Sequence, residues 1–419
     1  MNSVFNLKPD SGYPDSIDQK LNTFARQVSA YKKRSIGYPI NQDLGLTEFY
    51  SWYGQSGLTE LALNNAGSPH QASIAPLNTH VFENEVIDFL APLYGFQADN
   101  TWGVITLSGT QGNNLGIYFG TRLLIKQTGL KPVLYVSAEA HYSIKQLAEL
   151  QQLETRVIKT LVNGRMDIND FERQLVSNRP ALIIIAIGTT FKGAIDDQNA
   201  IQQVLDSKNN LAVYRHLDAA LFGGFLPFSP YAQLLDQNQQ WFDSIAVSGH
   251  KFFGIDEPAG IFITTKNIQS EQNQPRVPYL NQEIATLACS RSALAALKLW
   301  WKIQKTGFPS YQHQAQQLLD NAHYLKTGLE ASHYPAWLNP CSNTVYFKRP
   351  SQWIMEKWLL VPDDDLRLGG LLAHCVVMQH VSIEIIDEFL TDIGLDSLNN
   401  RQVQNTKQHD SVSPSLIDL

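Results

Sequence analysis

Cysteine is scarce in this chain of 419 residues, which contains only three, Cys289, Cys341 and Cys375. Three cysteines so far apart are too few for a disulfide framework, and they provide no cysteine ligand set for zinc. Because this scarcity is typical of a reducing compartment, we expect a cytoplasmic protein without a structural metal.

An excess of positive charge is also missing. The net charge is −7 and 17% of the residues are charged, so no basic surface for nucleic acid or anionic lipid is expected. The longest aliphatic run, residues 181–187, is too short to span a bilayer, and residues 1–10 lack the pattern of a signal peptide. We therefore expect small molecules and protein subunits as partners, and neither nucleic acid nor a membrane.

The chain is long enough for a large core and more than one domain. We expect an aromatic-rich N-terminal arm at 1–55, a large domain at 56–290, and a connector helix with a small C-terminal domain at 291–398. Residues 399–419 are rich in Asn, Gln, Ser and Asp without apolar periodicity, which predicts a disordered tail.

Short apolar runs alternate with helical patterns through the large domain, which predicts an α/β fold with a mostly parallel sheet covered on both faces. Strands are expected at 102–107, 132–136, 181–187, 211–217, 244–247 and 259–264, and helices at 77–94, 110–124 and 142–150. Beyond them we expect a long helical segment at 292–329, a strand at 344–347 and a helix at 383–393. In such sheets ligands bind beyond the carboxyl ends of the strands.

The most informative motif is Ser248-Gly249-His250-Lys251, which follows the β-branched run at 243–247. A lysine amine forms a Schiff base with an aldehyde only when it is positioned and partly deprotonated, and an enclosed site favours both conditions. Lys251 is therefore a candidate anchor for an aldehyde cofactor.

Two further strand ends carry polar groups that match the parts of such a cofactor. Residues 108–113 (Ser-Gly-Thr-Gln-Gly-Asn) follow a strand and open a helix, so their N–H groups and the Thr110 hydroxyl suit a phosphate. The alternative is an ordinary turn with Thr110 as helix N-cap. Asp218, in His216-Leu-Asp-Ala-Ala220, is placed to keep a pyridine nitrogen protonated, with Ala220 leaving room for a flat ring. A helix N-cap and half of a metal site are the alternatives for Asp218.

Three other positions have weaker local support. His141 follows a strand and suits stacking on an aromatic ring, although a lone histidine is more often structural. Gly188-Thr-Thr190 closes another strand with two hydroxyl groups, and Asp196-Asp197 is expected to cap the next helix. Asp256 and Glu257 are either solvated turn residues or carboxylates that bias the charge of the substrate, and we favour solvated turn residues.

Taken together, these motifs resemble the group II pyridoxal-phosphate amino acid decarboxylases, especially the branch of bacterial histidine decarboxylases and plant serine decarboxylases. The resemblance covers residues 35–395 in the same order and with similar spacing. It includes Leu63-Asn-Asn-Ala-Gly67, Phe82-Glu-Asn-Glu-Val86, Gly188-Thr-Thr-Phe-Lys-Gly-Ala-Ile-Asp-Asp197, Ser248-Gly-His-Lys251, Cys289-Ser-Arg291 and Met378-Gln-His380.

The resemblance implies pyridoxal phosphate as cofactor, fold type I, and decarboxylation of an L-amino acid. Lys251 would hold the cofactor covalently, His141 would stack on its ring, Asp218 would pair with the pyridine nitrogen, and Ala220 would line the opposite face. The phosphate would be held by Gly109, Thr110, Ser248 and His250, and Thr190 would lie near the ring hydroxyl. Tyr279 matches a tyrosine of the substrate-covering segment and, like His141, is a candidate for protonating Cα. The resemblance also implies a homodimer with its active sites at the subunit interface, which the aromatic arm favours.

The chain departs from the family pattern near the substrate. Gln111 stands where Glu is usual, Cys289 replaces a glycine, Ser292-Ala293 replaces Asn-Gly, and Ile284 replaces an aspartate. We therefore keep histidine as the first substrate hypothesis beside serine, a diamino acid, or oxidative deamination of an amino acid. A cofactor-binding protein without turnover is the alternative from another class.

Overall fold

A seven-stranded sheet forms the centre of the large domain in the computed structural model, which describes residues 16–208, 211–272 and 274–410, with 397–410 described by backbone alone. Its strands are β1 (Thr101–Thr106), β2 (Val133–Ser137), β3 (Glu154–Ile158), β4 (Ala181–Ala186), β5 (Val213–Asp218), β6 (Ser244–Ser248) and β7 (Gly260–Thr265). The order is β1-β7-β6-β5-β4-β2-β3, in which β7 runs antiparallel to both neighbours and the other pairs are parallel. The predicted mostly parallel sheet is confirmed.

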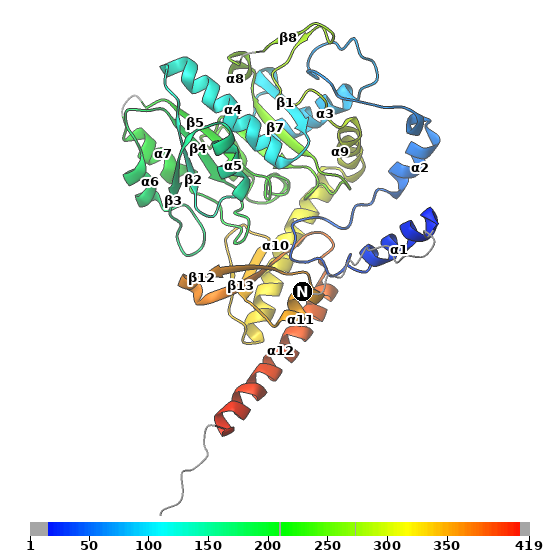
Figure 1. Cartoon of the computed structure of the whole chain (residues 1–419), viewed down its shortest axis with the longest axis vertical. Coiled ribbons are helices and arrows are strands. Elements are labelled where there is room, and N and C mark those ends of the chain that lie inside the picture. Colours follow the sequence, from blue (N-terminus) through cyan, green and yellow to red (C-terminus); the bar gives the residue numbers. More distant parts are fainter. Residues whose placement is uncertain (1–15, 209–210, 273, 411–419) are drawn as a thin grey trace, which may run out of the picture.

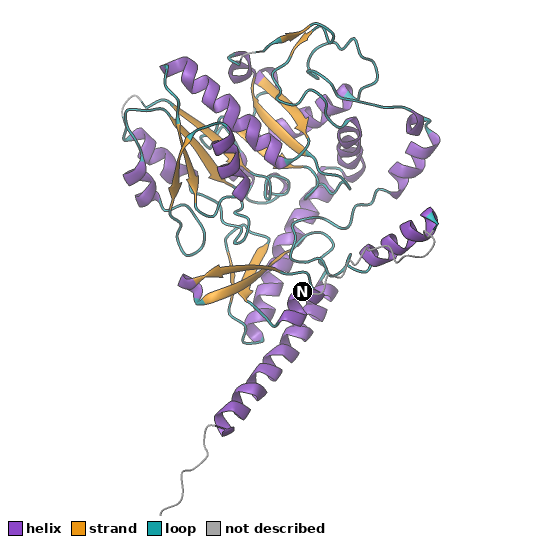
Figure 2. Cartoon of the chain, viewed as in Figure 1, coloured by secondary structure: helices purple, strands orange, loops and turns teal. Residues whose placement is uncertain are grey.

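Helices cover both faces of this sheet (Figures 1 and 2). In β4, Leu182 and Ile184 pack in a cluster with α4 and α5, while Ile183 and Ile185 pack in a second cluster with α3, α6 and α7. Because successive strand residues face opposite sides, a strand covered on both faces is apolar throughout. The helices are α3 (His80–Leu90), α4 (Gly109–Thr128), α5 (Tyr142–Leu150), α6 (Ile168–Gln174), α7 (Gln198–Asp206) and α8 (Lys266–Ser270).

The small C-terminal domain contains an antiparallel sheet of order β10-β11-β13-β12, packed beside two long helices (Figure 2). Its elements are β10 (Ala336–Leu338), β11 (Thr344–Lys348), β12 (Val361–Asp365), β13 (Gly370–Val376), α10 (Phe308–Ala331), α11 (Gln352–Lys357) and α12 (Ile383–Asp410). The sequence predicts β11 and the first part of α12. The strand β12 has the sequence Val-Pro-Asp-Asp-Asp and is largely exposed, so it lacks the apolar pattern from which a strand is predicted.

Two predictions for the C-terminal third need correction. The long helical segment at 292–329 is two helices, α9 (Ala293–Thr306) and α10, which are separated by Gly307 at φ 73°. The disordered tail predicted from Asn399 is wrong for residues 399–410, because α12 continues to Asp410. Extending an existing helix costs far less than starting one, so apolar periodicity is not needed there. Residues 411–419 lie outside the described part of the chain.

The N-terminal arm is more helical than its irregular pattern suggests. It contains α1 (Ile17–Ser29) and α2 (Thr47–Gln55), and no side chain of α1 is buried. In Figure 1, α1 stands away from the large domain. The two-residue strands β8 (Arg276–Val277) and β9 (Gln282–Glu283) pair antiparallel as a short hairpin. Short 3-10 turns lie at Leu58–Glu60, Ala91–Tyr94, Ala98–Asn100, Leu226–Phe228, Ala232–Leu235 and Leu366–Leu368.

Candidate active site

A cavity of about 370 Å³ lies at the carboxyl ends of the parallel strands. It brings together nine of the ten predicted site residues, which come from five separate segments of the chain. They are Gly109, Thr110, His141, Thr190, Asp218, Ala220, Ser248, His250 and Lys251. The prediction that these strand ends lie close together in space is therefore confirmed.

Lys251 follows the buried strand β6 through a tight turn. The N–H of Gly249 donates to the carbonyl of Ala259 at 2.8 Å, and the N–H of Ser248 donates to the carbonyl of Ala220 at 3.3 Å. Burial lowers the pKa of the Lys251 amine, and the negative charge of Asp218 opposes that shift. Burial thus favours the uncharged amine, the form that attacks a carbonyl.

Asp218 ends β5, is 7% exposed, and accepts a hydrogen bond from the N–H of Ala220 at 3.3 Å. Two residues earlier, His216 contacts the Ser244 hydroxyl through Nδ1 (2.8 Å) and Oδ1 of Asn113 through Nε2 (3.0 Å). Burial lowers the pKa of His216 to about 3, so its ring is neutral. Since both ring nitrogens have protein partners, the alternative of a His-x-Asp metal site is wrong. The described residues contain no group of three or more potential metal ligands.

His141 is the N-cap of α5. Its Nδ1 accepts a hydrogen bond from the N–H of Ser143 at 3.3 Å and lies 2.7 Å from the Ser143 hydroxyl. A nitrogen that accepts from a backbone N–H carries no proton, so the ring proton is on Nε2. Burial lowers the pKa of His141, with opposing effects from Asp218 and Lys251, and this favours the neutral ring.

The turn before α4 has the shape of an anion site. Its N-cap is Ser108, whose hydroxyl accepts from the N–H of Gln111 at 3.2 Å, so the alternative in which Thr110 is the N-cap is wrong. A Cβ at Gly109 would lie 2.4 Å from Oγ of Ser248 and 3.2 Å from Cβ of Ala220. Only glycine allows these segments to approach, and the first N–H groups of a helix lack partners within the helix. The N–H donors at the start of α4 suit a phosphate, the amine of Lys251 suits an aldehyde, and the buried carboxylate of Asp218 suits a pyridine nitrogen. Together these groups fit pyridoxal phosphate.

Some lining residues were missed by sequence reasoning. Asn113 lies inside the quoted turn motif, but its contact with His216 depends on tertiary structure. The remaining lining residues are Pro39, Ile40, Ser108, Ala186, Gly188, Thr189, Leu221 and Pro258. Pro39 and Ile40 belong to the N-terminal arm, for which the sequence gives no signal of proximity to the site.

Tyr279 does not line this cavity. Its side chain is 69% exposed and its hydroxyl lies 3.3 Å from Sγ of Cys289. Ile284 is buried. Gln111 accepts a hydrogen bond from the N–H of Leu107 at 2.7 Å, so the neutral side chain closes the strand-to-helix turn.

Asp256 and Glu257 are not merely solvated turn residues. The amine of Lys298, whose side chain is 3% exposed, donates to Asp256 at 2.7 Å and to Glu257 at 3.0 Å. The hydroxyl of Tyr50 also donates to Asp256. A buried ammonium requires such partners, so these carboxylates hold α9 and α2 against the segment after Lys251.

A larger hollow of about 1050 Å³ lies between α1, the segment that follows it and α2. It contains none of the predicted site residues. The smaller cavity remains the candidate active site because it holds the chemistry-bearing groups.

Three motifs of the family resemblance meet away from this cavity. Glu83 accepts hydrogen bonds from Asn65 at 2.8 Å and from the N–H of Ile105 at 2.8 Å, and it pairs with Arg291. Arg291 also donates to the carbonyl of Gly67 at 2.9 Å. These residues tie the loops beside β1 together, which is a structural role.

A mixed sheet with a buried lysine of lowered pKa, a buried aspartate and a helix N-terminus around one cavity defines a pyridoxal-phosphate enzyme of fold type I. A solved structure of L-methionine decarboxylase from Streptomyces sp. 590 has the same fold, with a TM-score of 0.79, 20% identity, and coverage of 93% of this chain and 97% of that one. The family model "Pyridoxal-dependent decarboxylase conserved domain" matches residues 122–339.

The chain belongs to the group II pyridoxal-phosphate-dependent amino acid decarboxylases, in the branch that contains histidine and serine decarboxylases. It is 34% identical to histidine decarboxylase of Solanum lycopersicum over 98% of this chain and 95% of that protein. It is also 34% identical to serine decarboxylase 1 of Oryza sativa subsp. japonica over 89% of this chain and 74% of that protein. Its cofactor is pyridoxal phosphate.

Proposed function

We propose that this decarboxylase converts L-histidine to its amine and CO2. The observation that carries the proposal is the similarity to a histidine decarboxylase over nearly the whole of both chains. The cavity agrees with an uncharged side chain. Among the described residues that line it, Asp218 is the single carboxylate and Lys251 the single amine, and both serve the cofactor. The described lining therefore offers no further carboxylate or amine to pair with the side chain of a glutamate or lysine substrate.

The proposed roles follow the positions of the side chains. Lys251 holds the cofactor through its amine, and Asp218 keeps a proton on the pyridine nitrogen. His141 and Ala220 would lie against opposite faces of the ring, and Thr190 would lie near its hydroxyl. Gly109, Thr110, Ser248 and His250 bind the phosphate at the N-terminus of α4.

The chain controls where the proton goes after CO2 leaves. Pyridoxal phosphate, when bound, supplies the electron sink that accepts the electron pair of the broken bond between Cα and the carboxylate. Asp218 keeps that sink positively charged, and a protein group then delivers a proton to Cα. His141 is one proposed donor on the cavity wall, and it would have to act as the imidazolium, with a proton taken up on Nδ1 before the Nε2 proton is given to Cα.

Tyr279 is the second proposed donor. Because it lies outside the cavity of its own chain, we propose that it reaches the substrate of a second subunit. Its position therefore links its proposed role to the proposed homodimer.

CO2 release from each of the twenty amino acids is the direct test of substrate. Histidine should give the highest kcat/KM, and serine is the second candidate because of the equal identity to the rice serine decarboxylase. Preference for any other amino acid would refute the histidine proposal. Cofactor-loaded protein that releases neither CO2 nor ammonia from any of them would favour a binding protein without turnover.

We also propose a homodimer. On α1 the apolar side chains Ile17, Leu21, Phe24 and Val28 recur every three to four residues, so they lie on one face, and all four are exposed. An apolar helix face of this kind requires a covering surface, and a second copy of the chain would cover it and fill the hollow beside α1.

Light scattering should give the mass of two chains, and Phe24→Glu should shift the protein towards the monomer with a parallel loss of activity. Thr23→Glu, on the polar side of α1, is the matched control and should remain dimeric. A wild-type protein that is a fully active monomer at all concentrations would refute the dimer.

A further inference from the structure

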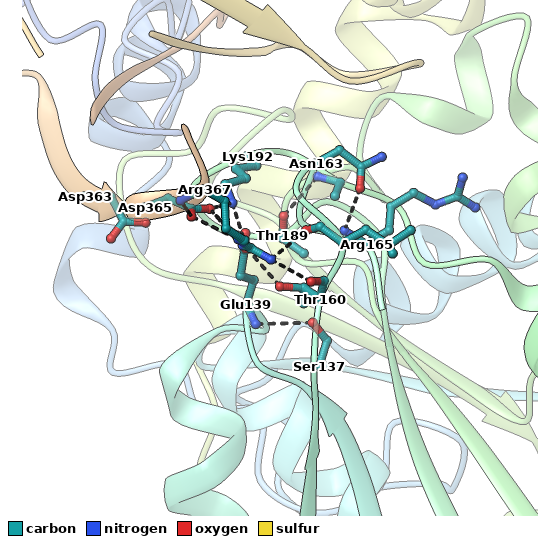
Figure 3. A network of polar contacts seen from close by, with 12 residues as sticks. Ser137, Glu139, Thr160, Asn163, Arg165, Thr189, Lys192, Asp363, Asp365 and Arg367 are labelled. Atoms are coloured by element: carbon teal, nitrogen blue, oxygen red, sulfur yellow. Dashed lines mark hydrogen bonds and ion pairs between the residues drawn. The ribbon is translucent and has the colours of Figure 1, made fainter. Parts of the chain in front are cut away.

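A cluster of four charged side chains joins the small domain to two loops of the active site (Figure 3). Glu139 and Lys192 come from the large domain, and Asp365 and Arg367 come from the end of β12 and the turn after it. We propose that this cluster, the domain clamp, positions His141 and Thr190, so that the small domain sets the geometry of the site. The inference rests on the proposed roles of His141 and Thr190.

The ion pairs cross the domain boundary in both directions. Lys192 Nζ lies 2.7 Å from Oε1 of Glu139 and 2.6 Å from Oδ2 of Asp365. Arg367 Nη2 lies 3.1 Å from Oε1 of Glu139 and 2.8 Å from Oδ2 of Asp365. Each cation therefore contacts one carboxylate from each domain, and the two positive and two negative charges balance.

The large domain adds contacts that fix the position of the clamp. Nη1 of Arg367 donates to the carbonyl of Thr160 at 2.6 Å, while the hydroxyl of Thr160 donates to Oε1 of Glu139 at 3.1 Å. Residues 160–161 follow β3, so Arg367 also holds the segment beside the edge strand. Figure 3 shows the side chains of these residues converging from separate segments.

Glu139 is two residues before His141 in a short, hydrogen-bonded turn. The N–H of Ala138 donates to the carbonyl of Ile158 at 2.8 Å, and the N–H of Ala140 donates to the carbonyl of Ser137 at 3.1 Å. The Ser137 hydroxyl accepts from the N–H of Glu139 at 3.2 Å. Because this turn is tightly bonded, a displacement of Glu139 would be passed on to His141.

Lys192 is two residues after Thr190 in a second tight turn. The N–H of Gly193 donates to the carbonyl of Thr189 at 2.9 Å, and the hydroxyl of Thr189 accepts from the N–H of Ala194 at 2.9 Å. Lys192 is thus held at the opposite end of the turn from the cavity-lining Thr190.

Burial makes the clamp sensitive to the loss of one member. The side chain of Lys192 is 1% exposed, and those of Glu139 and Asp365 are 20% and 9% exposed. Removing one partner from a buried ion pair leaves an uncompensated charge, so the remaining groups must move or admit water. None of the four clamp residues lines the cavity, which makes them positioning residues rather than catalytic ones.

A second contact beside the clamp connects the same turn to the arm. The ring of Phe191 stacks on His374 of β13 with 4.6 Å between centroids, and His374 Nε2 lies 3.0 Å from the carbonyl of Gly37. Gly37 is close in sequence to Pro39 and Ile40 of the cavity wall. The small domain therefore contacts the backbone near three parts of the site.

Asp365→Asn tests the proposal because it removes one charge of the clamp without changing the shape of the side chain. We expect kcat to fall about 10- to 100-fold, the range of loss that a displacement near 1 Å can cause. We also expect altered visible circular dichroism of the bound cofactor, and faster hydrogen exchange at residues 138–145 and 188–194 in cofactor-free protein.

Asp392→Asn is the matched control. Asp392 lies within the small domain, is 11% exposed, and pairs with Lys357 at 2.6 Å, so its burial resembles that of Asp365 although Lys357 is more exposed than Lys192. It should lower thermal stability while leaving kcat and the cofactor signal within twofold of wild type. If Asp365→Asn does not fold, Arg367→Gln at the exposed edge of the clamp takes its place.

His141→Ala, measured in parallel, tests the proposed role of His141 independently of the proposed role of the domain clamp. Full activity in His141→Ala would refute the role of His141, and hydrogen exchange would then decide alone whether the clamp holds the loops. Wild-type kcat together with wild-type exchange in the clamp variant would overturn the proposal.

Discussion

Burial and a nearby charge have opposing effects on the pKa values of residues that surround the cavity. Burial lowers the pKa values of Lys251, His141 and His250, while the carboxylate of Asp218 raises those of Lys251 and His141. Since burial is the largest cause in each case, the amine and the imidazoles shift towards their neutral forms. These are the forms in which an amine attacks an aldehyde and an imidazole stacks on a ring.

We expect Lys251→Ala to abolish the covalent attachment of the cofactor and to reduce kcat by at least about 1000-fold, since no other amine lines the described cavity. Borohydride reduction followed by peptide mass mapping should label Lys251 in the wild type and no residue in the variant. Lys298→Ala is a control for the loss of a buried lysine, and it should keep the label on Lys251. Labelling of a different lysine in the wild type would contradict the assignment.

The sequence is most informative for polar residues that directly follow an apolar strand. Lys251, Asp218 and Thr110 were found because a polar side chain directly after an apolar strand is visible without a structure. Asn113, Pro39 and Ile40 were not assigned a place at the site, because their positions depend on contacts between segments far apart in the chain. Asp256 and Glu257 were misinterpreted for the same reason, since their partner Lys298 lies more than forty positions later in the sequence.

The break between α9 and α10 determines how the chain leaves the large domain. Gly307 has φ 73° and ψ 157°, a combination that is essentially restricted to glycine. The helical pattern on both sides of it concealed the break, because an isolated glycine is tolerated inside a helix.

We expect Gly307→Ala to lower the free energy of unfolding by about 1–3 kcal/mol, because an added Cβ strains this backbone conformation. Gly394→Ala in α12 is the matched control, since Gly394 has open space around it and sits inside a helix. That change should stabilise the protein by about 0.5–1 kcal/mol. Urea denaturation measures both variants, and equal effects of the same sign would contradict this explanation of the break.

Buried histidines link the stability of the whole molecule to pH. Burial lowers the pKa of seven histidines, which are His70, His80, His141, His216, His250, His374 and His380. In the unfolded chain these groups take up protons below their ordinary pKa of about 6.5. The unfolded state therefore binds more protons than the folded state as the pH falls, and the free energy of unfolding decreases. Burial raises the pKa values of Asp196 (to about 6) and Asp243, which acts in the opposite direction.

We expect the free energy of unfolding of cofactor-free protein to be lower at pH 5 than at pH 7. His216, with a pKa of about 3 when folded, accounts for about 2 kcal/mol of that difference. His216→Gln should reduce the difference by this amount, whereas His313→Gln, at an exposed position, should not change it. Urea denaturation at the two pH values is the measurement, and an unchanged difference in His216→Gln would contradict the assignment.

The sequence by itself determined the α/β class and the family, and it led to Lys251 as the proposed cofactor lysine, because these depend on local patterns: apolar runs of strand length, and polar motifs at their ends. Tertiary structure decided which of these ends form one cavity and placed Tyr279 outside it. It also decided that Glu139 and Lys192 meet Asp365 and Arg367, and that α1 has an uncovered apolar face. The physical reason is that burial and ion pairing depend on the distance between atoms in space, and residues separated by up to 345 positions are in contact.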